Sequence, residues 1–182
     1  MGGAGDGGRS YERITPKDLD RLAEISRQDR EDFFARKPRY LVLEEGLVCV
    51  ALCQGAAQHF VDGENGVKDF DVWTFYAARP DHPAFPWRRR VARDFGDPRF
   101  GRTPNTAGFG GRRVDLLGRS IEVGEEGGPA AALAAYLSEG RTASARALAR
   151  KAADLLKPPD RRGAVVWPPG QLQANGGAGA IG

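Results

Sequence analysis

Apolar positions along the first third of the chain predict one long amphipathic helix. Thr15 and Pro16 are typical of a helix start, and the proline at position 38 disfavours helical backbone at Lys37. We therefore expect a helix that ends near Arg36. Its apolar positions, at near-helical spacing with charged residues between them, are Leu19, Leu22, Ile25 and Phe33.

Two later apolar runs predict strands. Leu47–Cys53 is a continuous apolar run, typical of a buried central strand. Residues 68–76, with the sequence KDFDVWTFY, are rich in β-branched and aromatic residues and predict a second strand. Between them the pattern favours a turn at Gln54-Gly55, a short helix over 56–61 and a polar turn over 62–66.

The second half of the chain predicts an alternation of loops, strands and helices. We expect, in order, a long loop over 79–111, two short strands about Gly118 within 113–123, a helix over 129–138, a second helix from about 142 to 156, and an edge strand over 164–167. Together the elements predict an α/β (α+β) fold, a mixed sheet with flanking helices, in one domain over residues 13–169. The Gly-rich segments 1–12 and 170–182 are expected to be disordered tails.

Charge is distributed unevenly along the 182 residues. The net charge is only +3, but residues 78–113 contain nine arginines and three aspartates and therefore carry +6. Such a basic segment favours anionic partners. No apolar run reaches the roughly 20 residues needed to cross a bilayer, and the start of the chain has no secretory-signal pattern. We therefore expect a cytoplasmic protein with no membrane partner.

Two aspartates in the second predicted strand are the first candidates for chemistry. Asp69 and Asp71 are two residues apart, so alternation places both side chains on one face of a strand. Two carboxylates on one face repel each other, and a divalent cation relieves that repulsion. Oxygen ligands suit Mg²⁺, with Mn²⁺ as the alternative. Asp115 stands alone between Val114 and Leu116 on a later predicted strand and is the best third ligand.

These residues resemble a known superfamily. The apolar strand, the Gly55 turn, a spacer, the Asp69-Phe70-Asp71 motif and a later acid flanked by apolar residues are similar to the nucleotidyltransferases that include DNA polymerase beta. The resemblance covers roughly residues 47–117. It implies that Asp69 and Asp71 bind metal, that Asp115 is the third catalytic acid and that Gly55 contacts phosphate. One departure is Ala56, where the family has a serine that touches the triphosphate.

The resemblance implies transfer of a nucleoside monophosphate from a nucleoside triphosphate to an acceptor. The sequence does not identify that acceptor, and RNA and a small molecule are both candidates. Lys68, Arg88 and Arg90, together with the turn at Gly55 and Ala56, are candidate nucleotide-binding residues. Aromatic residues interleave with the arginines of residues 85–102, a pattern that also suits stacking of a base.

Three alternatives stay open. Asp69 and Asp71 are also compatible with an ordinary solvated strand face. A nucleotidyltransferase-like module that has lost catalysis and binds RNA or a partner protein is favoured by Ala56. A metal-dependent phosphohydrolase would use the same three acids.

Overall fold

A computed structural model describes residues 8–170 and places six strands in one mixed sheet flanked by helices. The predicted fold class is thereby confirmed. The order of the strands across the sheet is β3-β4-β2-β1-β5-β6. The strands are β1 (Leu47–Cys53), β2 (Phe70–Ala77), β3 (Val91–Asp94), β4 (Arg113–Ile121), β5 (Ala153–Lys157) and β6 (Val165–Trp167).

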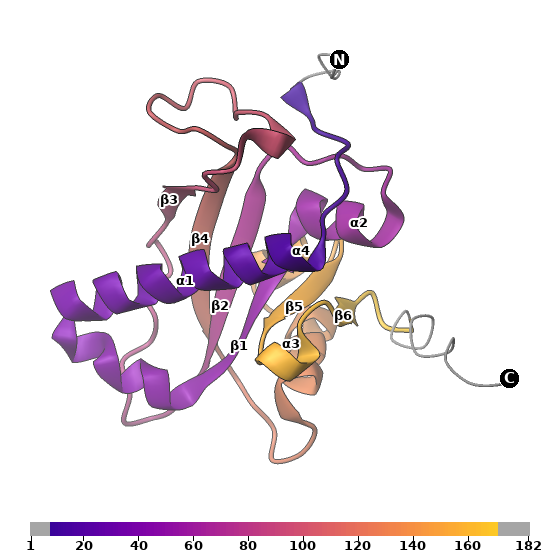
Figure 1. Ribbon diagram of the computed structural model, residues 1–182. Helices are drawn as coiled ribbons and strands as arrows, with labels where there is room; N and C mark the ends of the chain where they lie inside the picture. Colours follow the sequence, from indigo (N-terminus) through magenta and orange to yellow (C-terminus); the bar gives the residue numbers. More distant parts are fainter. Residues whose placement is uncertain (1–7, 171–182) are drawn as a thin grey trace, which may run out of the picture.

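Helices cover both faces of this sheet, as Figure 1 shows. The α-helices are α1 (Pro16–Arg36), α2 (Gln54–Asp62), α3 (Gly128–Glu139) and α4 (Ala143–Leu148), and the 3₁₀ segments are η2 (Pro38–Gly46), η3 (Pro98–Phe100) and η4 (Pro159–Arg161). Helix α1 crosses one face, and α3 and α4 pack on the other. No helix within residues 8–170 is long and apolar enough to cross a membrane.

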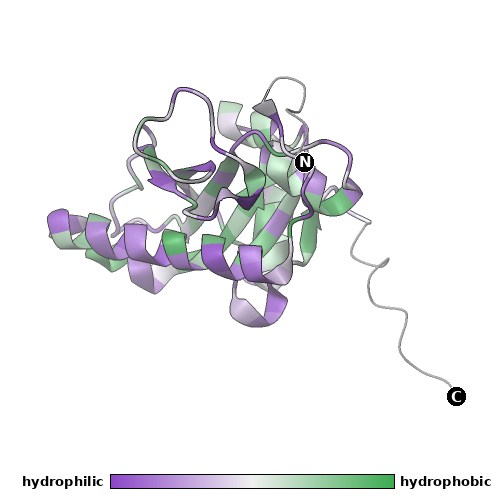
Figure 2. Cartoon of the chain, turned by 45° about the horizontal axis from the view of Figure 1, so that its top comes forward, coloured by the Kyte–Doolittle hydropathy of each residue, from purple (hydrophilic) through white to green (hydrophobic). Residues whose placement is uncertain are grey.

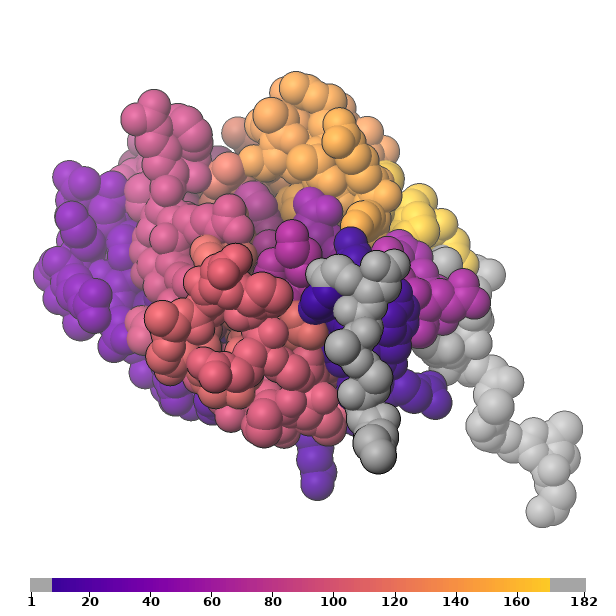
Figure 3. Space-filling model, turned by 90° about the horizontal axis from the view of Figure 1, so that it is seen from above, coloured from indigo at the N-terminus to yellow at the C-terminus, as the bar shows by residue number. Residues whose placement is uncertain are grey.

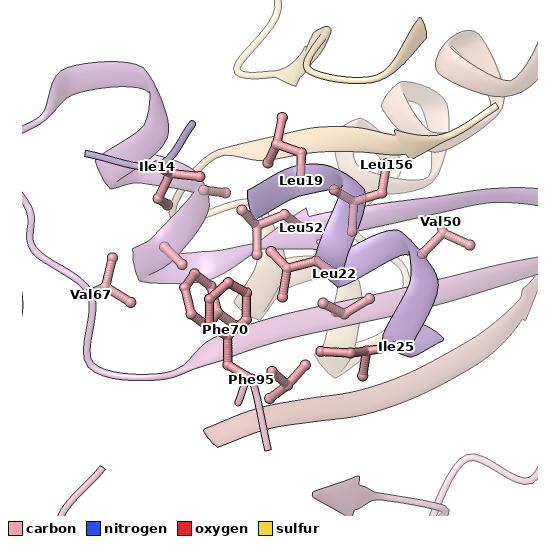
Figure 4. Close-up of a cluster of buried hydrophobic side chains, with 14 of the residues drawn as sticks. Ile14, Leu19, Leu22, Ile25, Val50, Leu52, Val67, Phe70, Phe95 and Leu156 are labelled. Carbon is pink, nitrogen blue, oxygen red and sulfur yellow. The ribbon is translucent and has the colours of Figure 1, made fainter. Parts of the chain in front are cut away.

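The long helix begins and ends where the sequence predicts. Thr15 accepts a hydrogen bond from the Asp18 backbone N–H, and the Asp18 carboxylate accepts one from the Thr15 backbone N–H. This capping box satisfies two backbone donors at the helix start. The apolar stripe of α1 lies on the sheet (Figure 4), where Leu22 packs in one cluster with Leu52 and Phe70. Figure 2 shows that α1 is largely polar outside this stripe, although Asp18, Ser26, Asp29 and Arg30 are buried.

The centre of the sheet consists of β1, β2 and β4. Strand β1 pairs antiparallel with β2, whereas β2 pairs in parallel with β4. Alternate residues of β2 enter different cores, since Phe70 and Val72 lie under α1 while Trp73 and Phe75 lie under α3. Burial on both faces explains the nearly continuous apolar sequences of β1 and β2.

The elements predicted over residues 113–156 differ from the structure in two places. The predicted pair of strands about Gly118 is one continuous strand, β4, which runs through that glycine. Gly118 serves packing here, because a Cβ at that position would lie 2.7 Å from the Phe85 ring. The helix expected over 142–156 ends at Leu148, and residues 153–157 form strand β5 beside β1.

The Arg-rich segment predicted as a long loop contains a short strand and a 3₁₀ turn. Strand β3 pairs antiparallel with β4 at the edge of the sheet. Asp94 then organises the next loop, because its carboxylate accepts hydrogen bonds from the backbone N–H groups of Gly96, Gly110 and Gly111. The predicted tails fall largely outside the described residues, but Ser10 forms an antiparallel bridge with Val67.

Candidate functional site

The sheet aligns three residues at the end of its central strands. Cys53, the last residue of β1, is the register partner of Asp71 on β2, and Asp71 is the partner of Asp115 on β4. Neighbouring strands lie about 4.8 Å apart, so the Asp71 and Asp115 side chains are next to each other on one face. Helix α2 begins immediately after Cys53, at the same end of the sheet (Figure 1).

Asp115 is a buried acid held by two arginines. Only 1% of its surface is exposed. Arg90 donates to its Oδ2 at 2.7 Å, and Arg113 donates to its Oδ1 at 2.8 Å. A buried carboxylate without such partners would be strongly unfavourable, so both guanidinium groups are needed when no other cation is present.

Asp69 lies directly before β2 and is tied to the loop that follows β3. The Thr103 hydroxyl donates to the Asp69 carboxylate at 3.1 Å. The Thr103 Oγ1 atom also accepts a hydrogen bond from the Arg113 backbone N–H at 2.9 Å. Thr103 therefore links the start of β2 to the start of β4. Through this link the loop brings Asp69 to the end of the sheet where Asp115 lies.

Asp71 has no comparable partner. Its half-buried side chain accepts no hydrogen bond from a residue within the described range 8–170. Burial is the largest cause that raises the pKa of Asp71, to about 6, followed by the charges of Asp115 and Asp69. Arg90 and Arg113 act in the opposite direction without cancelling the shift. Asp71 is therefore a carboxylate whose negative charge is poorly compensated.

The donor chemistry fits a hard divalent cation in part. Asp69 and Asp71 offer carboxylate oxygens with no cationic hydrogen-bond partner, which suits Mg²⁺ or Mn²⁺. Across residues 8–170, however, no three His, Cys, Asp or Glu side chains already form a group that could hold a metal ion. Asp115 is turned to its arginines, so it would join as a ligand only after Arg90 and Arg113 release it.

The turn between β1 and α2 has features of a phosphate site. The first backbone N–H groups of α2 receive no side-chain cap, and Gln54 has a φ of 62°, which is unusual for a residue with a side chain. A Cβ placed on Gly55 would lie 3.7 Å from Lys151 Nζ and 3.9 Å from Arg9 Nη1. Two cations thus flank the positive end of a helix.

The asparagine at position 65 and a histidine fix this turn. Asn65 donates to the Gly55 carbonyl at 2.9 Å. His59 is buried, and its Nδ1 accepts from the Gly66 N–H at 3.0 Å while its Nε2 lies 3.0 Å from the Glu12 carbonyl. With Nδ1 as acceptor, Nε2 carries the proton and donates to Glu12. Both ring nitrogens of His59 are therefore used in holding α2.

The other predicted nucleotide-binding residues are placed less closely. The Ala56 side chain is fully buried in the cluster under α1, so its backbone N–H is its only group that can face a phosphate. Lys68 and Arg88 are exposed, and Arg88 lies over the Trp87 ring at 4.7 Å. Neither has a side-chain hydrogen bond or ion pair to Asp69, Asp71 or Asp115 within the described part of the chain.

Sequence reasoning missed three residues of this region. Arg113 pairs with Asp115 because the two are two residues apart on β4, a signal that strand alternation provides. Thr103 gave no signal, since only the folded loop brings it to Asp69. Asp154 is fully buried on β5 with both carboxylate oxygens unpartnered, and burial raises its pKa to about 8. The sequence pattern predicts helix up to about residue 156, so it does not indicate a buried strand acid at this position.

Comparisons with protein-family models, with curated proteins and with solved structures found no match to this chain.

Proposed function

We propose that the protein is a metal-dependent nucleotidyltransferase that moves a nucleoside monophosphate from a nucleoside triphosphate to an acceptor and releases pyrophosphate. The observation that carries the proposal is the position of Asp71, between Asp115 on one side and the end of β1 on the other. Asp71 is an acid whose negative charge is poorly compensated, and it lies beside a second acid and near a helix N-terminus without a side-chain cap. This combination suits a metal-bound triphosphate.

In this proposal Asp69 and Asp71 hold Mg²⁺ or Mn²⁺, and Asp115 completes the set. A bound metal ion would neutralise negative charge on the triphosphate oxygens around the reacting phosphorus. Asp115 also accepts a hydrogen bond from the attacking hydroxyl and orients it, a role open to a carboxylate next to the transferred group. The half-buried position of Asp71 strengthens its attraction for a cation, because the local dielectric constant is lower than in water.

The triphosphate is held from the side of α2. The backbone N–H groups at Gly55 and Ala56 donate to phosphate oxygens, and Lys151 and Arg9 add positive charge beside them. This arrangement does without the serine hydroxyl that the family has at position 56. It also assigns a function to the strained backbone at Gln54, which sets the direction of the first turn of α2.

Arg90 and Arg113 take two roles in succession. Without ligand they neutralise buried Asp115. If a metal took their place at that carboxylate, both guanidinium groups would be available to the nucleotide phosphates. Arg90 is well suited to this exchange because 56% of its side chain is exposed. Lys68 and Arg88 remain candidates for more distant phosphate contacts.

The proposed location of the protein is the cytoplasm.

Two rival functions make different predictions. A catalytically inactive module would bind RNA or a protein without needing metal, and the absence of the serine hydroxyl at Ala56 favours it. A phosphohydrolase would use the same acids but would transfer the phosphoryl group to water. Analysis of the products separates the two enzymes, because a transferase attaches labelled nucleotide to an acceptor, RNA or a small molecule, and a hydrolase does not.

Calorimetric titration of each nucleoside triphosphate, with Mg²⁺ and with EDTA, tests the proposal. The wild type is expected to bind at least one of the four only with Mg²⁺, and Asp71→Asn should weaken this binding by at least about tenfold. Asp160→Asn, an exposed aspartate in η4, serves as the control and should bind like the wild type. Absence of metal-dependent binding in the wild type would overturn the proposal.

A further inference from the structure

A cavity on the opposite side of the edge strand from the acids has the chemistry of a nucleic-acid site. Its volume is about 360 Å³, and it lies between the C-terminal half of α1 with the start of η2 and the segment 86–93. In Figure 3 the violet atoms of α1 and η2 lie beside the rose atoms of the segment 86–93. We refer to it as the α1–β3 pocket.

The register of β3 separates this pocket from the acids. Ala92 is the partner of Asp115, whereas Arg93 is the partner of Val114, which belongs to the cluster under α1. Successive residues of a strand point to opposite faces, so Arg93 points to the face of α1. The α1–β3 pocket and the acidic site are thus two sides of one short strand at the edge of the sheet.

The acids in the pocket are already neutralised. Asp29 is buried, and its carboxylate accepts two parallel hydrogen bonds from the Arg89 guanidinium, at 2.8 and 3.0 Å. Arg93 donates to Asp32 at 2.7 Å and lies 3.4 Å from Asp29. Two acids and two arginines therefore cancel in formal charge and form one wall of the pocket.

Three further cations at the pocket have no acidic partner. Arg36, Lys37 and Arg39 are exposed, and within residues 8–170 none of them lies within 4.0 Å of a carboxylate. The pocket consequently carries an uncompensated charge of about +3. Cations this close together repel one another, and the anion that relieves this repulsion must approach from solvent.

Aromatic rings provide the second half of the site. Phe33 and Tyr40 are stacked, with ring centroids 5.3 Å apart and an interplanar angle of 27°. The Arg39 guanidinium lies 4.7 Å above the Tyr40 ring, and that of Arg89 lies 4.3 Å above Phe33. Arg39 also donates to the Tyr40 hydroxyl at 2.9 Å, which holds its guanidinium at the ring. Flat aromatic and guanidinium surfaces beside cations without acidic partners are the elements that bind a base and its flanking phosphates in single strands.

We propose that the α1–β3 pocket binds single-stranded nucleic acid, with Arg36, Lys37 and Arg39 at the phosphates and Tyr40 under a base. The cavity admits about one nucleotide, with the neighbouring phosphates on the exposed cations. If the proposed function holds, a strand that leaves the pocket across β3 reaches Arg90 and Asp115, so the bound strand is the acceptor. Binding itself needs neither metal nor the three acids.

Fluorescence anisotropy with labelled 12-nucleotide single-stranded RNA, in EDTA and over a range of salt concentrations, tests this inference. The wild type is expected to bind. The triple variant Arg36→Gln, Lys37→Gln, Arg39→Gln should lose at least about tenfold in affinity, and its slope of log affinity against log salt should be smaller by about 2. Tyr40→Leu should weaken binding by a similar factor with an unchanged slope, because it removes stacking and no charge.

A second triple variant keeps the same net charge as the first. Lys17→Gln, Arg150→Gln, Arg161→Gln removes three exposed cations outside the pocket and should bind RNA like the wild type. Equal losses in both triple variants, equal affinity for double-stranded RNA, or no RNA binding by the wild type would overturn the inference. Asp71→Asn should bind RNA normally, so failure of the nucleotidyltransferase proposal and failure of this one are distinguishable.

Discussion

Asp71 and Asp115 are register partners on parallel strands, yet two guanidinium groups bind Asp115 and Asp71 accepts no hydrogen bond from any residue of the described range 8–170. The charge of Asp115 is neutralised by its arginines, whereas the carboxylate of Asp71 is repelled by the neighbouring acids without a cationic partner of its own. This asymmetry is unfavourable for the free protein and favourable for a cation that arrives later.

The asymmetry predicts that Asp71→Asn stabilises the metal-free protein. The raised pKa of Asp71 means that its ionised form is destabilising at neutral pH, so removal of the charge should add about 1 kcal/mol to the free energy of unfolding. Urea unfolding at pH 7.5 in EDTA measures this difference. At pH 3, where the carboxyl is protonated in both folded and unfolded chains, the gain should disappear. A variant less stable than the wild type at pH 7.5 would refute the prediction.

Arg90→Gln should separate metal binding from nucleotide binding. Loss of one partner leaves Asp115 more available, so Mn²⁺ without nucleotide should bind a few-fold more tightly. The triphosphate with Mg²⁺ should bind about tenfold more weakly, because a cation near its phosphates is gone. Parallel titrations measure both constants, and changes of both in the same direction would contradict the two roles given to Arg90.

Lys151→Gln should weaken nucleotide binding by about tenfold without changing stability. Lys151 Nζ lies beside Gly55 at the start of α2, and no carboxylate within residues 8–170 pairs with it. Lys157→Gln is a matched control, since Lys157 is exposed at the end of β5. Similar nucleotide affinities for the two variants would show that α2 is not the phosphate site.

Asp154 predicts a pH dependence of stability. The Asp154 carboxyl has an ordinary pKa of 3.8 in the unfolded chain, and burial raises its pKa to about 8 in the folded protein. As the pH rises, this carboxyl therefore ionises in the unfolded chain first. The free energy of unfolding should therefore fall between about pH 4 and pH 8, by roughly 1.4 kcal/mol per pH unit from this group. Asp154→Asn should remove that slope. Unfolding curves of both proteins at several pH values measure it, and identical pH profiles would contradict the assignment.

The proximity of Asp71 and Asp115 could be predicted because it depends on short-range pattern. Asp71 alternates with the apolar residues of β2, and the lone acid between Val114 and Leu116 indicates a second strand with the same property, whereas Asp69 lies just before β2. Their meeting required only that the two strands be neighbours, which a small sheet with few strands favours.

The partners of Asp115 could not be predicted in the same way. Arg90 reaches it only because β3 pairs antiparallel with β4 at the sheet edge, and residues 79–111 have no periodicity that indicates a strand. A four-residue edge strand has too few residues to form a pattern.

Strand β5 shows where local propensity fails. The alanines before Asp154 favour helix, but the edge of β1 is open and pairing there buries Leu155 and Leu156 completely. Burial of two leucine side chains is worth several kcal/mol, about 1.5–3 kcal/mol each, which exceeds the propensity difference. The buried Asp154 was hidden by the same error.

Electron paramagnetic resonance of Mn²⁺ tests the central claim most directly, because free Mn²⁺ gives a signal that bound Mn²⁺ loses. With a non-hydrolysable triphosphate present, the wild type should bind about two Mn²⁺ per chain, as expected for paired ions shared by three carboxylates. Asp71→Asn should bind fewer than about one, and Asp160→Asn should match the wild type. Equal Mn²⁺ binding by the wild type and Asp71→Asn would contradict the claim that these acids hold the metal.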